Sequence, residues 1–320
     1  MQLPSLEEIH NATQLVRAVM PPTPQYSWPL LNARSKTEVW VKHENHSPVG
    51  AFKLRGALVY MDWLKKTQPA VKGVIGATRG NHGQGVALAA SRLELTSVIV
   101  VPHGNSREKN RAMRSLGAEL IEHGDDFQAA LEYSRNLAET RRLHPVPSFH
   151  PLLVHGTATY ALEFLKGAPG LDAVYVPIGL GSSICGMIAV RNALGLKSKI
   201  IGVVAEDAPA YAVSFREKKA VSAVANSRLA DGLSCRVPVP EALEIMLANV
   251  DHIVEVSEGE IATAMRAYYE DTHNVAEGAA GAGLAALLKE RDALCGKRAG
   301  VVLTGGNVDR ELFLDTLKNI

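Results

Sequence analysis

The chain has 320 residues, 47% hydrophobic and 21% charged, which is close to the composition of ordinary globular proteins. The formal net charge of +1 provides no basic field, so neither nucleic acid nor a membrane surface is expected as a partner. There is no signal-peptide pattern and no apolar run near the ~20 residues of a membrane helix. Three scattered cysteines suit a reducing compartment, so we expect a cytoplasmic protein with a substantial core.

Short β-branched runs alternate with helical patterns along the chain, which indicates an α/β fold with parallel sheets. The predicted strands are Gly73–Ala77, Ser97–Pro102, Ala118–Glu122, Ala173–Ile178, Lys199–Val204, His252–Val256 and Gly300–Thr304. The predicted helices include Ser106–Leu116, Phe127–Arg142 and Thr157–Leu165, and Ser257 with Glu260 predicts a capping box for another. The proline-rich segment His144–Pro151 predicts a crossing between two lobes with a cleft between them.

The first segment that suggests chemistry places Lys53 after a Pro/Gly turn and beside Phe52. A lysine in partly apolar surroundings has a lowered pKa, which suits Schiff-base chemistry. Taken alone, the segment is more simply explained as a surface lysine that opens a helix.

Two further segments each join a strand to a helix through a polar, glycine-containing loop. Backbone N–H groups and the helix dipole at such a place favour a carboxylate or a phosphate. The first loop contains Thr78, Arg79, Gly80, Asn81 and His82, and the second contains Gly179, Leu180, Gly181, Ser182 and Ser183. The second loop fits neither the P-loop nor the dinucleotide pattern. Ordinary tight turns, with Asn81 as a helix cap in the first, are the alternative.

A fourth segment ends a strand with Thr304 and continues as Gly305-Gly306-Asn307 near the C-terminus. A hydroxyl at the carboxyl end of such a strand lies where open α/β sheets bind ligands. A capped turn is the alternative explanation.

In this order, the four segments resemble those of the threonine/serine dehydratase group of fold-type II pyridoxal-phosphate enzymes. The resemblance runs from Pro22 to Asp309 and includes Lys42–Asn45, Ala230–Gly232 and Glu277–Gly281. It implies a two-lobed, three-layer α/β fold like the tryptophan synthase β chain, with parallel or mixed sheets and helices on both faces. The implied large lobe comprises residues 1–62 and 150–320. The implied small, mobile lobe comprises residues 63–149 and closes over the substrate.

The resemblance also implies roles for individual residues. Lys53 would hold pyridoxal 5'-phosphate covalently and remove the substrate α-proton, with Phe52 beside the ring. Asn81 would bind the ring 3'-oxygen and Thr304 the pyridine nitrogen. The phosphate would lie on Gly179, Leu180, Gly181, Ser182 and Ser183. The substrate carboxylate would lie on the loop of Thr78, Arg79, Gly80, Asn81 and His82.

Departures from the family pattern bear on specificity. Arg79 stands where related serine racemases carry a serine base, and arginine stays protonated, so racemase activity is disfavoured. Either Arg79 binds a second substrate carboxylate, as in 3-hydroxyaspartate, or it points to solvent or pairs with an acidic residue. Ala212 stands six residues after Glu206, where metal-binding relatives carry an aspartate, so no dedicated metal site is expected. Weaker pocket candidates are Arg135, Ser234, Cys235 and Glu277.

The resulting prediction is a homodimeric ammonia-lyase that converts a small 3-hydroxy amino acid, of the L-threonine or L-serine type, to a 2-oxo acid and ammonia. The chain ends soon after Asn307, so we expect no regulatory domain and a catabolic role. The open alternatives are a dehydratase for 3-hydroxyaspartate or phenylserine, a racemase, and a β-replacement synthase. A binding protein that kept the fold is the non-enzymatic alternative.

Overall fold

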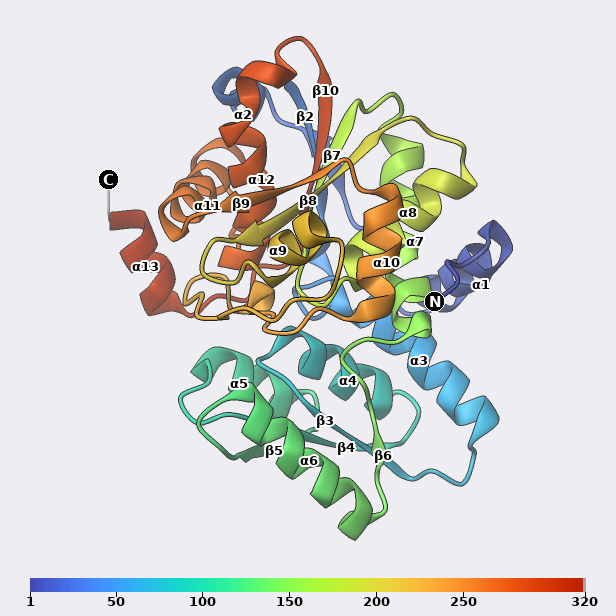
Figure 1. Cartoon of the computed structure of the whole chain (residues 1–320). Coiled ribbons are helices and arrows are strands. Elements are labelled where there is room, and N and C mark those ends of the chain that lie inside the picture. The colour runs from blue at the N-terminus through green and yellow to red at the C-terminus, as the bar shows by residue number, and fades with distance from the viewer. Residues whose placement is uncertain (319–320) are drawn as a thin grey trace.

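The computed structural model describes residues 1–318 and contains two sheets of unequal size (Figure 1). The strand orders are β1-β2-β10-β7-β8-β9 and β5-β4-β3-β6. The strands are β1 (Gln25–Ser27), β2 (Glu38–His43), β3 (Gly73–Ala77), β4 (Thr96–Val101), β5 (Glu119–Glu122), β6 (His144–Pro145), β7 (Ala173–Pro177), β8 (Lys199–Ala205), β9 (His252–Val256) and β10 (Arg298–Leu303). All neighbours are parallel except β1, which pairs antiparallel with β2 at one edge. The predicted fold class is confirmed.

Helices separate the strands and cover both sheets. They are α1 (Leu6–Arg17), α2 (Pro29–Ser35), α3 (Lys53–Thr67), α4 (Asn81–Ser91), α5 (Arg107–Ser115), α6 (Phe127–Arg141), α7 (Pro151–Gly167), α8 (Ser182–Ala193), α9 (Ala210–Glu217), α10 (Pro240–Asn249), α11 (Glu258–Thr272), α12 (Gly278–Lys289) and α13 (Arg310–Lys318). The predicted capping box that starts α11 is confirmed. Within residues 1–318, no helix has the length and hydrophobicity to cross a bilayer.

Sequence reasoning missed the interior strand β2 and the edge strands β1 and β6. Two of the last residues of β2, Lys42 and His43, are polar and yet buried, so the strand does not read as an apolar run. It also placed the start of α7 six residues late. The structure begins this helix at Pro151, and the His150 ring accepts a hydrogen bond from the Leu152 N–H.

Alternate residues of the smaller sheet pack into two different cores. Ile99 and Val101 of β4 face α3 and α4, whereas Val98 and Val100 face α6. A strand that is covered on both faces is apolar throughout, which is why the sequence predicted these strands. Figure 1 shows this sheet, with α4, α5 and α6, below the larger unit. We call β3 to β6 with these three helices the small unit, and the rest the large unit.

A buried ionic cluster holds the start of α3 in place. The Arg55 guanidinium donates to Glu44 at 2.7 Å and to Glu163 of α7 at 2.9 Å, and the Lys42 Nζ lies 2.7 Å from Glu163. Two positive and two negative charges therefore offset one another out of water. Removing one partner of such a cluster typically costs about 3–5 kcal/mol. The cluster fixes α3 at a point two residues beyond Lys53.

Candidate active site

Four segments meet at the carboxyl ends of parallel strands. β3 leads into the loop before α4, and β7 leads into the loop before α8. β10 is followed by Thr304, and its neighbour β2 leads through a short 3-10 helix (Glu44–His46) toward Lys53. Backbone bonds join the last two segments: the Phe52 N–H donates to the Thr304 carbonyl at 3.0 Å, and Ala51 bridges to Gly305. The strands thus bring together residues that are more than 250 positions apart in the chain.

The amine of Lys53 lies close to the loop before α8. Its Nζ is 3.4 Å from the Ser182 Oγ and 4.7 Å from the centroid of the Phe52 ring. Removal from water lowers the pKa of Lys53 to about 8, and the Glu277 carboxylate opposes this with a smaller effect. The amine is therefore far easier to deprotonate than an ordinary lysine, which is what nucleophilic or basic chemistry requires.

The loop before α8 offers backbone rather than side-chain groups. Gly181 occupies the N-cap with a φ of 103°, and no side chain caps the helix. The first N–H groups of this twelve-residue helix are therefore available to an anion. The Ser183 Oγ lies 2.6 Å from the buried Tyr160 hydroxyl, so that side chain is engaged with the core.

The side chains of the loop before α4 form hydrogen bonds within the site. Gly80, not Asn81, is the N-cap residue, so the alternative that Asn81 caps the helix is wrong. The Asn81 amide donates to Glu277 at 2.5 Å and accepts from the Asn307 amide at 2.8 Å. Thr78 is buried and its hydroxyl accepts from the Gly80 N–H at 3.0 Å. These contacts join the first predicted loop to the turn after β10.

His82 is held uncharged inside the same region. Its ring is buried, and its Nε2 has no hydrogen-bond partner. Burial, with a further contribution from the nearby charge of Lys53, lowers the pKa of His82 to about 3. The Glu277 Oε2 accepts no hydrogen bond, and its one partner is the Lys109 ammonium group, an ion pair at 3.4 Å. A buried ring nitrogen without a partner beside an amine marks a place for a polar ligand.

Other predicted candidates lie farther from this chemistry. Arg79 and Arg135 have exposed side chains, and neither forms an ion pair within residues 1–318. Burial raises the pKa of Cys235 to about 12, so it remains a thiol and not a nucleophile. The Ser234 hydroxyl donates to the Ser227 carbonyl. The described residues contain no cluster of three or more metal-ligating side chains, and Glu206 lies 3.6 Å from the Lys289 amine.

Sequence reasoning missed Lys109 of α5. This buried lysine forms ion pairs with Asp231 at 2.9 Å and with Glu277 at 3.4 Å. Nothing local distinguishes it from the other basic residues of its helix, because its partners lie more than 120 positions away.

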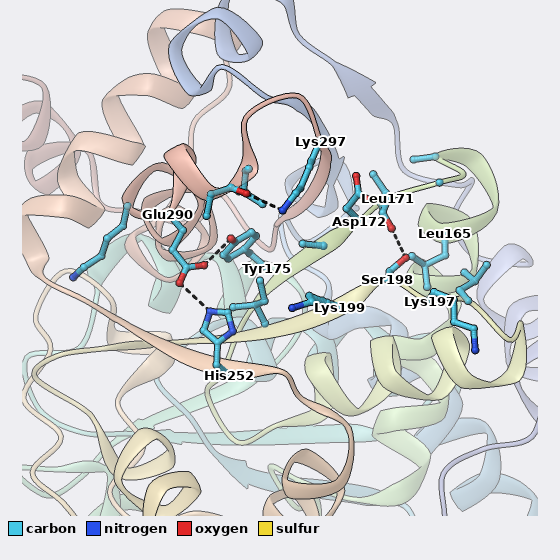
Figure 2. Close-up of a pocket in the computed structure, with 18 of the residues that line it drawn as sticks. Leu165, Leu171, Asp172, Tyr175, Lys197, Ser198, Lys199, His252, Glu290 and Lys297 are labelled. Carbon is cyan, nitrogen blue, oxygen red and sulfur yellow. Dashed lines mark hydrogen bonds and ion pairs between the residues drawn. The ribbon is translucent and has the colours of Figure 1, made fainter.

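A separate cavity of about 790 Å³ opens at the amino ends of β7, β8 and β9 (Figure 2). Its polar side chains bind one another: the Tyr175 hydroxyl donates to Glu290 at 2.7 Å, and the His252 ring lies 2.9 Å from the same carboxylate. None of the unpartnered buried polar atoms found among residues 1–318 lines it. We assign it no ligand.

A family model described as pyridoxal-phosphate dependent enzyme matches residues 16–305. The chain belongs to this family. It is 33% identical to an L-threonine ammonia-lyase of Thermotoga maritima, over 95% of the chain and 76% of that relative. It is 31% identical to an L-threo-3-hydroxyaspartate ammonia-lyase of a Pseudomonas species, over 99% of the chain and 100% of the relative. A biosynthetic threonine dehydratase of Haemophilus influenzae is 32% identical, and the chain spans 56% of its length.

Solved structures give the same result. A threonine deaminase from Solanum lycopersicum superposes with a TM-score of 0.88 at 26% identity, covering 98% of this chain and 94% of that one. A pyridoxal 5'-phosphate-dependent aspartate racemase superposes with a TM-score of 0.91 at 26% identity, covering 97% and 98%. The predicted family is confirmed.

The residues present fit the family's cofactor. The uncapped start of α8 supplies N–H donors for a phosphate, and Lys53 supplies an amine of lowered pKa within 3.4 Å of that helix. The unpartnered Nε2 of His82 adds a polar atom to the same enclosure. Pyridoxal 5'-phosphate needs a lysine beside an anion site, and Lys53 lies beside the uncapped start of a helix.

Proposed function

We propose that this enzyme is a pyridoxal-phosphate-dependent ammonia-lyase that acts on a small 3-hydroxy amino acid of the L-threonine or L-serine type. The observation that carries the proposal is the placement of Lys53 between the uncapped start of α8 and the polar loop before α4. When bound, the cofactor supplies an electron sink for the negative charge that forms at the substrate Cα. The chain's own residues then have to position the substrate, move its proton and exclude water.

We assign the phosphate to the backbone of Gly179, Leu180, Gly181, Ser182 and Ser183, and the pyridine nitrogen to Thr304. A neutral hydroxyl at that nitrogen leaves it without a carboxylate partner, which favours elimination over transamination. Phe52 would pack beside the ring, and Asn81 is assigned to the ring 3'-oxygen. Support comes from the Thr304 carbonyl, which already binds the Phe52 N–H, and from the contact of Lys53 with Ser182.

Lys53 Nζ is the proposed acceptor of the Cα proton. The 3-hydroxyl group takes up one proton, which balances the proton removed from Cα, and leaves Cβ as water. The enamine that is released becomes an imine and takes up water to give the 2-oxo acid and ammonia. The substrate carboxylate is assigned to Thr78, Arg79, Gly80, Asn81 and His82. We propose that residues 63–149 move as a lobe that closes this loop over the substrate and shields the reacting bond from water.

The direct test is to incubate the cofactor-loaded protein with L-threonine, L-serine, 3-hydroxyaspartate and phenylserine and to measure 2-oxo acid formation. Turnover of threonine or serine is the expected result. If none of the four substrates yields a 2-oxo acid, the proposed activity is wrong. Racemisation or β-replacement, measured in parallel, would then replace it.

L-threo-3-hydroxyaspartate is the second candidate substrate, because the chain matches an ammonia-lyase for this compound over that relative's full length. Arg79, exposed in the substrate loop, is the residue that would receive the second carboxylate. Replacing Arg79 with alanine should then reduce activity on 3-hydroxyaspartate at least about tenfold more than activity on serine. Equal losses on both substrates would exclude this role.

We further propose a cytoplasmic homodimer with a role in amino-acid breakdown. The three cysteines are free, which suits a reducing compartment. Apolar side chains are exposed on the large unit, with Tyr26, Leu30 and Tyr269 each more than 40% accessible. The reaction consumes an amino acid and releases ammonia, as a degradative enzyme does. Sedimentation equilibrium tests the dimer, and replacement of Leu30 and Tyr269 with glutamate should shift it to monomer.

A further inference from the structure

One lysine links the small unit to the large unit by charge. Lys109 of α5 reaches across with its Nζ 2.9 Å from the Asp231 Oδ2 and 3.4 Å from the Glu277 Oε2. Within residues 1–318, these are the only ion pairs that join residues 73–145 to the rest of the chain. The lysine side chain is 8% exposed, so the contact is shielded from solvent.

The same lysine packs against the proposed substrate loop. A Cβ added to Gly80 would lie 2.4 Å from the Lys109 Cδ and 3.0 Å from its Cγ. Gly80 has a φ of 152° and no room for a side chain, so loop and lysine are in direct contact. The lysine stem thus supports the loop while its ammonium group contacts the large unit.

The charge of Lys109 also favours the ionised form of Glu277. Burial raises the pKa of Glu277, the Lys109 ammonium opposes this, and the Asp231 carboxylate adds to it. The charged groups that face Glu277 are Lys109 from α5, Lys53 from α3 and Asp231. Glu277 in turn accepts the hydrogen bond from Asn81. A charged Glu277 strengthens that bond, so the position of Asn81 depends on Lys109.

Neighbouring residues support the same contact. The Ser106 hydroxyl donates to the Asp309 carboxylate, and Glu108 accepts from the Arg310 N–H at 3.2 Å. The start of α5 is therefore fastened to the segment that follows the Gly-Gly-Asn turn. The first of these contacts is partly buried and the second is exposed, whereas Lys109 is the buried member of the set.

We propose that Lys109 is a positioning residue for the reaction: its ammonium group ties the loop Thr78–His82 to Asp231 and Glu277 of the large unit and keeps Glu277 charged to hold Asn81. Lys109 acts through these residues and not on the substrate itself. The kinetic part of this inference rests on the proposed function. The structural part does not.

The test compares Lys109→Met with Arg111→Met in the holoenzyme. Methionine keeps the apolar stem against Gly80 and deletes the charge, and Arg111 is an exposed cation on the same helix. Hydrogen exchange, measured without substrate, should rise in residues 78–82 and 107–115 of Lys109→Met only. The kcat/KM on the preferred substrate should fall at least about tenfold, mainly through KM, since a buried charge pair has been broken.

A double variant separates positioning from simple structural support. In Lys109→Met, the pKa of the uncompensated Glu277 should lie above its value in the wild type and add a new ionisation to the pH profile of kcat/KM. Adding Glu277→Gln should remove that ionisation and restore part of the loss. The proposal would be overturned if hydrogen exchange in Lys109→Met matched that in Arg111→Met. It would also be overturned if the kcat/KM of the double variant were no higher than that of Lys109→Met.

If Lys109→Met does not fold, Asp231→Asn removes the opposite end of the ion pair at a partly exposed position. It should raise exchange in the same two segments, and unchanged exchange there would overturn the proposal. If the wild-type enzyme turns over no hydroxy amino acid, the proposed function fails. The exchange comparison still decides the role of Lys109, because it needs no substrate.

Discussion

The loop before α4 and the loop before α8 have the same local layout, a buried strand followed by a glycine-containing turn and a helix. The two loops present different groups at the site, one backbone and the other side chains. The α8 loop presents backbone N–H groups from a helix whose N-cap glycine has a φ of 103°, and its Ser183 side chain is turned into the core. The α4 loop presents side chains, with Asn81 bound to Glu277 and Asn307. A shared turn pattern therefore predicts where a ligand binds, but not which groups bind it.

The largest expected effect concerns the residue that lies between the two loops. Lys53→Ala removes the covalent attachment of the cofactor and the base, so activity should fall at least about 10³-fold. The rate of 2-oxo acid formation and the absorbance of the lysine-bound cofactor measure it. Lys66→Ala, on the exposed end of the same helix, is the control and should leave both unchanged. Retention of half the activity in Lys53→Ala would contradict the assignment.

A substitution in the loop before α8 should act by changing the backbone geometry of that loop. Gly181→Ala places a methyl group 2.8 Å from the Ala242 Cβ at a positive φ, so we expect a loss of about 1–3 kcal/mol of stability and weaker retention of the cofactor. Gly195→Ala, at the other end of α8, has a φ of 63° and open space around it. That control should lose only about 1 kcal/mol and keep the cofactor. Thermal melts and dialysis against buffer compare the two.

Side-chain deletions should reduce activity to different extents in the two loops. Asn81→Ala removes one hydrogen bond from Glu277 and one from Asn307, so kcat/KM should fall by about 10–100-fold. Leu180→Ala changes a residue whose backbone is the part assigned to the phosphate, and activity should change less than about threefold. Steady-state kinetics on the same substrate give both values. Equal losses would mean that the two loops work in the same way.

The smallest expected effect is on the pH dependence of cofactor uptake. Because the pKa of Lys53 is lowered to about 8, the neutral amine increases steeply up to pH 8 and then levels off. The rate at which apoenzyme takes up pyridoxal 5'-phosphate should rise about fivefold from pH 7 to 8 and less than about twofold from pH 8 to 9. A tenfold rise over the second interval would indicate an ordinary lysine. Stopped-flow absorbance resolves the difference.

The sequence alone determined the α/β class and the order of the four segments. Strands such as β4 are covered on both faces, so they appear as continuous apolar runs that no other structure explains as simply. Turn chemistry also placed Lys53, Gly181 and Thr304 at the ends of elements, because glycine and short polar residues act locally. The sequence did not predict β2, because it contains the polar residues Lys42 and His43. Their burial is explained only by partners such as Glu163, which are distant in the chain.

Only the tertiary structure decided how the site is held together. Asn81 proved to be bound to Glu277, 196 positions away, and not a helix cap. Lys109 proved to be buried against Asp231, 122 positions away, whereas the more conspicuous Arg79 is exposed. A charged side chain has the same local propensity whether it is paired or solvated, so the sequence cannot tell the two apart. Burial and the position of a counter-charge are set by the packing of the two units.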